Sequence, residues 1–452
     1  MKFKKFGKAL LLSALSAVSV LGITSCIRSY SVGYLFVVGT TTAESTGNGI
    51  ISGFKIDHNT GKLNPIAGLP VSSGGVNPGR SILLPGGRFV YVLNRGKNAE
   101  GTADCTTIAD PCVGANITQF AVGGNGILTP QETFYTQGIN PFRMINDSSG
   151  NYIYVLDHDS PSGAACSLVL GTGVNSCGDI TAFAVNQTTG RLTLVVNAQA
   201  TSAGGQALSY FPVPANPVDF LLVSSYILTM SGTPTTGDSV FPYNWAQVGG
   251  QLTLNQNSSQ PLNILNGTAL VTGSGGGANV VYVLDNDPIT YIPTGQSAEV
   301  TAPSQILPFT VGTNGALQAE TGGRIPDDPT LSNPIFALTV SVSKGSVLYV
   351  ANQGNNTDPN NAQSGIAGYI INTPFQLTEQ AGSPFGSGAG PQCMVEDPSN
   401  QYIYTANFND STVTGRSIDQ NDGYLNPLPS SANKSYPLNG PATWCMVTGR
   451  TG

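Results

Sequence analysis

Five side chains that could handle an anionic substrate occur at repeated points of the sequence. Arg80, Arg143 and Asp219 each stand two residues after a proline, whereas Arg95 and His158 each follow the Asn or Asp that ends a β-rich run. Guanidinium groups bind carboxylates and stabilise developing negative charge, and a histidine can serve as a general base. If their elements converge, we expect an anion-binding mouth with His158 as the catalytic base.

A structural interpretation of the same residues competes with this one. Arg80 and Arg143 would pair with acids inside the fold, and His158 would be an ordinary loop residue. No cofactor is expected. A metal site is not expected either, because the chain has two histidines and no Cys-x-x-Cys motif.

The elements that must position these residues are read from an internal repeat. A β-rich run, a tight turn that usually bears Gly, and then a Leu recur at intervals of 48 to 65 residues, ending at Leu63, Leu128, Leu192, Leu252, Leu317, Leu377 and Leu425. Between these copies a proline loop precedes an apolar strand, a turn and an alternating strand, such as 89–94 or 152–157. Together they predict four antiparallel strands per repeat, which is a propeller blade.

The two ends of the repeat region are complementary fragments of one blade. The segment 34–39 matches a second strand with no first strand before it, and 441–447 matches a first strand with nothing after it. Sharing one sheet would close the ring and remove exposed edges. We therefore predict an all-β, seven-bladed β-propeller over residues 33–449, closed by the N- and C-terminal strands.

The repeated Pro-then-strand and Tyr-Val-x-Asn units resemble the family of seven-bladed lactonase-like propellers. That family includes the propeller-type 6-phosphogluconolactonases and carboxymuconate-cyclising enzymes. The resemblance implies hydrolysis of a sugar lactone or a related cyclic ester at the mouth of the central channel. In active relatives a His beside the loop proline and a Glu after the strand-end Asn surround this mouth. Neither stands at the matching positions here, so those roles are not carried over.

Two functions follow from this pattern. The first is a lactonase-like hydrolase that takes a small lactone or carbohydrate-like ligand. The second is a non-catalytic propeller that binds an envelope protein or glycan. All long insertions, 95–115, 158–178, 286–303 and 353–363, are expected on one face, and clustered insertions mark a binding face in repeat proteins. We expect a monomer.

The N-terminus has the pattern of an export signal. Four lysines precede the apolar stretch 9–22, and Ile23-Thr24-Ser25-Cys26 resembles a bacterial lipobox. We expect residues 1–25 to be a signal peptide, Cys26 to be lipidated, and 26–32 to form a tether to the periplasmic or cell-surface side of the envelope. The alternative is an ordinary secretory signal with a chance Cys. Cleavage would change the net charge from −7 to −11, which disfavours nucleic-acid binding.

The six remaining cysteines would then meet an oxidising compartment. Cys105 and Cys112 lie in one insertion, and Cys166 and Cys177 lie in the next, so each pair is predicted to form a local disulfide. Cys393 and Cys445 fall on the first strands of neighbouring blades. They either pair or stay as separate buried thiols.

Overall fold

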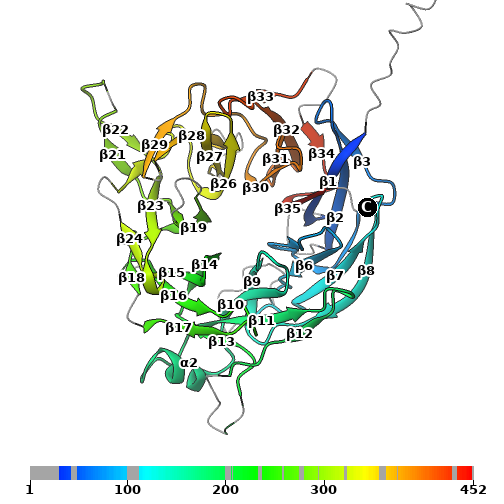
Figure 1. Ribbon diagram of the computed structural model, residues 1–452, viewed down its shortest axis with the longest axis vertical. Coiled ribbons are helices and arrows are strands. Elements are labelled where there is room, and N and C mark those ends of the chain that lie inside the picture. The colour runs from blue at the N-terminus through cyan, green and yellow to red at the C-terminus, as the bar shows by residue number, and fades with distance from the viewer. Residues whose placement is uncertain are drawn as a thin grey trace, which may run out of the picture.

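The computed structural model describes residues 30–41, 48–98, 111–198, 205, 207–232, 237–256, 259–273, 279–293, 295–319, 323–355, 363–373, 375–429 and 435–449. Cys26, the predicted signal peptide and Cys105 lie outside these residues. Within them, seven sheets of four antiparallel strands stand around a common axis (Figure 1). The predicted seven-bladed β-propeller is confirmed. No helix in the described ranges is long and apolar enough to span a membrane.

Each blade has an inner strand, two middle strands and an outer strand. The inner strands of blades 1 to 7 are β35 (Ala442–Gly449), β5 (Ile82–Leu83), β9 (Ile139–Asn146), β14 (Pro217–Val223), β19 (Gly267–Thr272), β26 (Pro334–Val342) and β30 (Pro391–Glu396). The second strands are β1 (Ser31–Thr40), β6 (Phe89–Asn94), β10 (Tyr152–Asp159), β15 (Tyr226–Ser231), β20 (Val280–Asp285), β27 (Gly345–Asn352) and β31 (Tyr402–Asn407).

Most of the outermost strands are only three or four residues long and are more exposed than the strands inside them. The third strands are β2 (Asn48–Asp57), β7 (Asn116–Val122), β11 (Gly178–Val185), β16 (Ser239–Trp245), β23 (Gln305–Val311), β28 (Gly365–Thr373) and β32 (Thr412–Ile418). The outer strands are β3 (Leu63–Pro65), β8 (Leu128–Phe134), β12 (Leu192–Leu194), β17 (Leu252–Leu254), β24 (Leu317–Ala319), β29 (Gln376–Glu379) and β33 (Leu425–Pro427).

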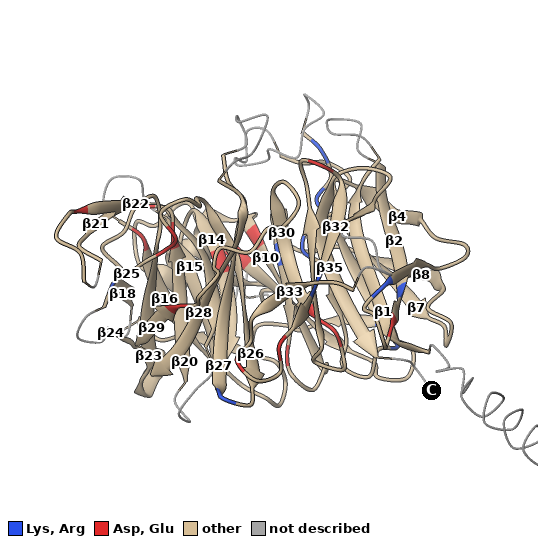
Figure 2. Cartoon of the chain, turned by 90° about the horizontal axis from the view of Figure 1, so that it is seen from above, with Lys and Arg blue, Asp and Glu red and all other residues tan. Residues whose placement is uncertain are grey.

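Short additions complete the set of described elements. Five blades carry an extra strand against the third one, namely β4 (Val71–Val76), β13 (Phe211–Val213), β18 (Gln260–Pro261), β25 (Ile325–Pro326) and β34 (Ser435–Pro437). A separate hairpin of β21 (Ile289–Tyr291) and β22 (Val300–Ala302) projects from blade 5 (Figure 2). The helical elements include α2 (Gly163–Leu170) and the 3₁₀ turn η2 (Thr313–Gly315).

The ring closes as the sequence predicts. Strand β1 pairs with β2 on one side and with the C-terminal β35 on the other, and Val37 lies opposite Cys445. Cys445 also forms a disulfide with Cys393 of β30, with 5.9 Å between the two Cα atoms. The sequence left this pairing open. Hydrogen bonds to β1 and a covalent bond to blade 7 thus hold the same closing strand.

Buried tyrosines join neighbouring blades. Tyr404 of blade 7 is fully buried, and its hydroxyl donates to the carbonyl of Gly61 in blade 1 at 2.7 Å. Tyr91, Tyr154 and Tyr349 make the same contact with the turn glycine of the next blade. Gly61 has a φ of +66°, and an added Cβ there would collide with the ring of Tyr402. The repeated hairpin glycine therefore serves both the turn and the blade interface.

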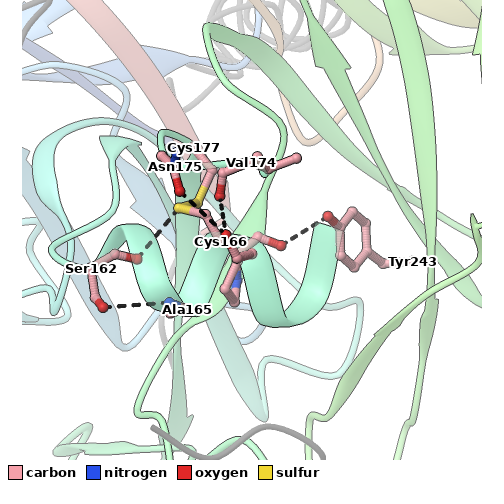
Figure 3. The surroundings of a disulfide bond; sticks show 9 residues. Ser162, Ala165, Cys166, Val174, Asn175, Cys177 and Tyr243 are labelled. Carbon is pink, nitrogen blue, oxygen red and sulfur yellow. Dashed lines mark hydrogen bonds between the residues drawn. A yellow bond between two sulfur atoms is a disulfide. The ribbon is translucent and has the colours of Figure 1, made fainter. Parts of the chain in front are cut away.

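The described parts of the insertions follow the second strands and lie on one face, called here the insertion face. In blade 3 the insertion folds into α2, a helix that the sequence analysis did not predict. The Ser162 hydroxyl accepts from the backbone N–H of Ala165 and caps its N-terminus, as Figure 3 shows beside the Cys166–Cys177 disulfide. That predicted disulfide is confirmed. Cys112 is also disulfide-bonded.

Candidate functional site

The register of the inner strands brings equivalent residues together near the insertion face. In blade 3, Pro141 lies opposite Asp157, a register shift follows, and Arg143 lies opposite Leu156. In blade 4 the same shift brings Asp219 opposite Met230. An extra residue at this bulge re-aims the side chain that follows it.

Arg80, Arg143 and Asp219 are in contact, so both arginines pair with an acid inside the fold, as the structural interpretation of these residues predicted. Arg80 Nη1 donates to Asp219 Oδ1 at 3.0 Å, and Arg143 Nε lies 3.5 Å from the same oxygen. The other carboxylate oxygen accepts from the backbone N–H of Leu270 in blade 5 at 3.0 Å. Because Arg80 and Asp219 belong to blades 2 and 4, which are not neighbours, their contact lies beside the ring axis.

Arg95 lies close to this group. The position that a Cβ would take at Gly79 is 3.1 Å from Arg95 Cδ. Burial, followed by the charge of Arg80, lowers the pKa of Arg143 to about 10; Asp219 opposes the shift, and Arg95 adds to it. Arg143 stays charged at neutral pH. We call Arg80, Arg95, Arg143 and Asp219 the arginine cluster, in which Arg80 and Arg143 contact one carboxylate and Arg95 lies nearby.

Aromatic side chains from blades 1 and 6 adjoin the arginine cluster, which the sequence analysis missed. The guanidinium of Arg80 stacks over the ring of Trp444 in blade 1 at 4.7 Å from its centroid. Phe336 of blade 6 meets the same indole edge-on, with 5.4 Å between centroids. Trp444 could have been found from the strand register. The bulge between Val38 and Gly39 puts Trp444 at the position in blade 1 that Arg143 holds in blade 3.

His158 lies in a different environment from the arginines. Its Nδ1 is 3.1 Å from Asp159 Oδ2, which also accepts from Asn140 Nδ2 at 2.9 Å. The imidazole is about one-fifth exposed. It contributes to a pocket of about 530 Å³ whose lining also includes Val218, Asp238 and Thr268 from blades 4 and 5. The lining of this pocket mixes polar and apolar residues, and its other residues also come from blades 4 and 5.

One aromatic ring connects the histidine with the arginine cluster. The Phe142 ring centroid is 6.2 Å from the His158 ring and 5.5 Å from the Arg143 guanidinium carbon. The two groups that the sequence analysis combined into one site therefore flank a single side chain of β9. No group of three or more His, Cys, Asp or Glu residues that could hold a metal ion occurs in the described ranges.

Comparison with known proteins agrees with this architecture. Residues 48–208 match the model of the family described as Lactonase, 7-bladed beta-propeller. No curated protein matches the chain. The chain is thus a seven-bladed β-propeller, and its expected resemblance to the lactonase propellers is confirmed.

Solved structures give the same result for the fold. A candidate 6-phosphogluconolactonase from Bacteroides fragilis is 17% identical with a TM-score of 0.59, and the match covers 92% of this chain and 98% of that one. A second, from Bacteroides uniformis, is 14% identical with a TM-score of 0.60 over 92% and 99%. A protein from Lactobacillus plantarum is 14% identical with a TM-score of 0.54 over 92% and 99%. At such identities the likeness concerns the fold.

Proposed function

We propose that this propeller hydrolyses a sugar lactone or related cyclic ester that carries a negative charge. The observation that carries the proposal is the surplus of positive charge in the arginine cluster, where Asp219 is the carboxylate shared by Arg80 and Arg143. The Arg143 side chain keeps about a third of its surface exposed, so it can reach a bound anion. The match to the lactonase family model supports the same chemistry.

In this proposal His158 is the general base. A proton on Nδ1 would be shared with Asp159, which leaves the lone pair of Nε2 to accept a proton from water. The water oxygen bonds to the lactone carbonyl carbon, and the carbon–oxygen bond of the ring breaks. The proton returns from His158 to the leaving alkoxide, and the product is a hydroxy acid. Arg143 stabilises the oxyanion that forms between these steps.

The proposal includes export to the cell envelope. The lipobox-like sequence before Cys26 supports cleavage and lipidation there. Growth with labelled palmitate should label the wild-type chain, whereas the Cys26→Ser variant should remain unlabelled and uncleaved. Labelling of both chains, or of neither, would contradict the lipid anchor.

The experiment for the activity is a titration of released acid with residues 27–452 and a panel of lactones. Arg143→Ala should lower the rate by about tenfold or more, the loss typical of one charged stabilising group. The matched control is Arg191→Ala, because Arg191 is two-thirds exposed in a turn on the other face. Absence of turnover across the panel would contradict the hydrolase and favour the binding propeller.

A further inference from the structure

Blade 3 contains a buried pair of carboxyl groups next to His158. Asp157 ends β10 and Asp179 begins β11, and the two residues are direct partners across the ladder. Neither has any exposed surface. The hydrolytic mechanism does not use them. Their charges therefore require a separate explanation, because an isolated buried carboxylate is strongly disfavoured.

Equivalent positions in blades 5 and 2 show how an amide can satisfy this junction. In blade 5 the partners are Asp285 and Gln305, and Gln305 Nε2 donates to Asp285 Oδ2 at 2.7 Å. In blade 2 they are Asn94 and Asn116, and Asn94 Nδ2 donates to Asn116 Oδ1 at 2.9 Å. Each of these pairs has an amide N–H between the two side chains. Two carboxyl groups have a donor only if one of them is protonated.

The surroundings provide too few donors for two charges. The hydroxyl of Thr181 donates to Asp157 Oδ2 at 3.0 Å, and Thr136 and the Gly138 N–H also bond to Asp157. Asp157 Oδ1 and both oxygens of Asp179 lack any other hydrogen-bond donor in the described structure. The charged and titratable groups nearby are Asp159 and Tyr210, and Asp159 itself contacts His158.

We propose that Asp157 and Asp179 share one proton at neutral pH and that losing it loosens the segment 136–143, which carries Arg143. The two carboxyls are within hydrogen-bond reach of each other, and burial raises the pKa of both. The pair then behaves as one acid, like other close carboxyl dyads.

The link to the segment is a close packing contact. A Cβ added at Gly138 would lie 2.6 Å from Asp157 Cγ and 2.6 Å from Asp179 Oδ1. The Gly138 backbone therefore packs closely against both carboxyl groups. Gln137 N also donates to the Thr181 hydroxyl at 2.9 Å. Repulsion between two carboxylates would act directly on residues 137 and 138, shortly before β9 begins.

The first test is infrared difference spectroscopy of the full chain at pH 7. Subtracting the spectrum of Asp179→Asn from that of the wild type should leave the carbonyl band of a protonated carboxylic acid. Asp157→Asn should give the same difference, and blade 5 shows that an acid–amide pair fits this junction. Asp285→Asn is the matched control and should not remove the band. No acid band in either difference spectrum would overturn the shared proton.

The second test is amide hydrogen exchange as a function of pH. After correction for intrinsic rates, exchange of residues 136–143 in the wild type should rise severalfold between pH 6 and pH 9. It should stay level in Asp179→Asn. Equal pH dependence in both chains would overturn the coupling of the dyad to this segment. Neither readout depends on lactone turnover, so failure of the hydrolase proposal would be seen separately.

Discussion

Arg80 donates a hydrogen bond to Asp219 across 139 residues of sequence and between blades that are not neighbours. Asp219 also accepts from the backbone of blade 5. One fully buried carboxylate therefore connects blades 2, 4 and 5 and partly neutralises the arginine cluster. Asp219 therefore contributes both to the stability of the ring and to the proposed anion site.

Asp219→Asn should destabilise the protein by about 3 kcal/mol, because it leaves the poorly exposed Arg80 without its counter-charge. Urea unfolding followed by fluorescence measures the change. The control is Glu132→Gln, which breaks an exposed pair with Arg191 and should change stability by less than about 1 kcal/mol. Equal effects of the two substitutions would show that the buried pair adds little.

Tyr404→Phe should cost about 1 to 3 kcal/mol, because the buried carbonyl of Gly61 loses its donor while the packing of the ring is kept. The Tyr402→Phe variant is a matched comparison, since that hydroxyl contacts the His58 carbonyl where the side chain is less buried, and its cost should be smaller. If Tyr404→Phe were neutral in urea unfolding, the tyrosine bonds would not join the blades energetically.

Replacing Cys393 and Cys445 together by Ala should lower the unfolding free energy by about 2 to 4 kcal/mol, since the bond closes a loop with a sequence separation of 52. The Cys166–Cys177 bond spans 11 residues, so its double Ala variant should lose less. A larger loss from opening the short loop would contradict the role given to the closing strand.

Glu396→Gln should make stability less dependent on pH. Burial, followed by the nearby charge of Asp397, raises the pKa of Glu396 to about 7. A carboxyl whose pKa is raised on folding stabilises the folded state at low pH, and this contribution is lost as pH rises from about 4 to 7. The unfolding free energy of the wild type should fall between pH 5 and pH 8. In the variant this fall should be smaller by about 1 kcal/mol, allowing for solvent screening. An unchanged fall would contradict the assignment.

Sequence reasoning predicted the fold well because the repeat is strong and the ends are complementary. The spacing of prolines, glycines and alternating strands was enough to place Arg80, Arg143 and Asp219 at equivalent positions. It could not give the contacts between distant blades. Which side chains meet at the axis, such as Arg80 and Trp444, depends on bulges and on the diameter of the closed ring, and neither has a local signature.

The blade 3 insertion shows a second limit. Helix α2 is only eight residues long with Gly and Ala at its start, and so short a helix depends on tertiary packing and its cap rather than on propensity. The dyad of Asp157 and Asp179 was invisible for a related reason. Their sequence positions are unremarkable, and only the ladder register brings the carboxyls together.

The most direct test of the account is the ratio of kcat/KM for a carboxylated lactone to that for its uncharged methyl ester. The wild-type chain should prefer the anionic lactone by about tenfold or more, which corresponds to about 1.4 kcal/mol of transition-state stabilisation. Arg143→Ala should bring the ratio close to one. Equal rates on both substrates, or a preference that survives in the Arg143→Ala variant, would contradict an anion site at the arginine cluster.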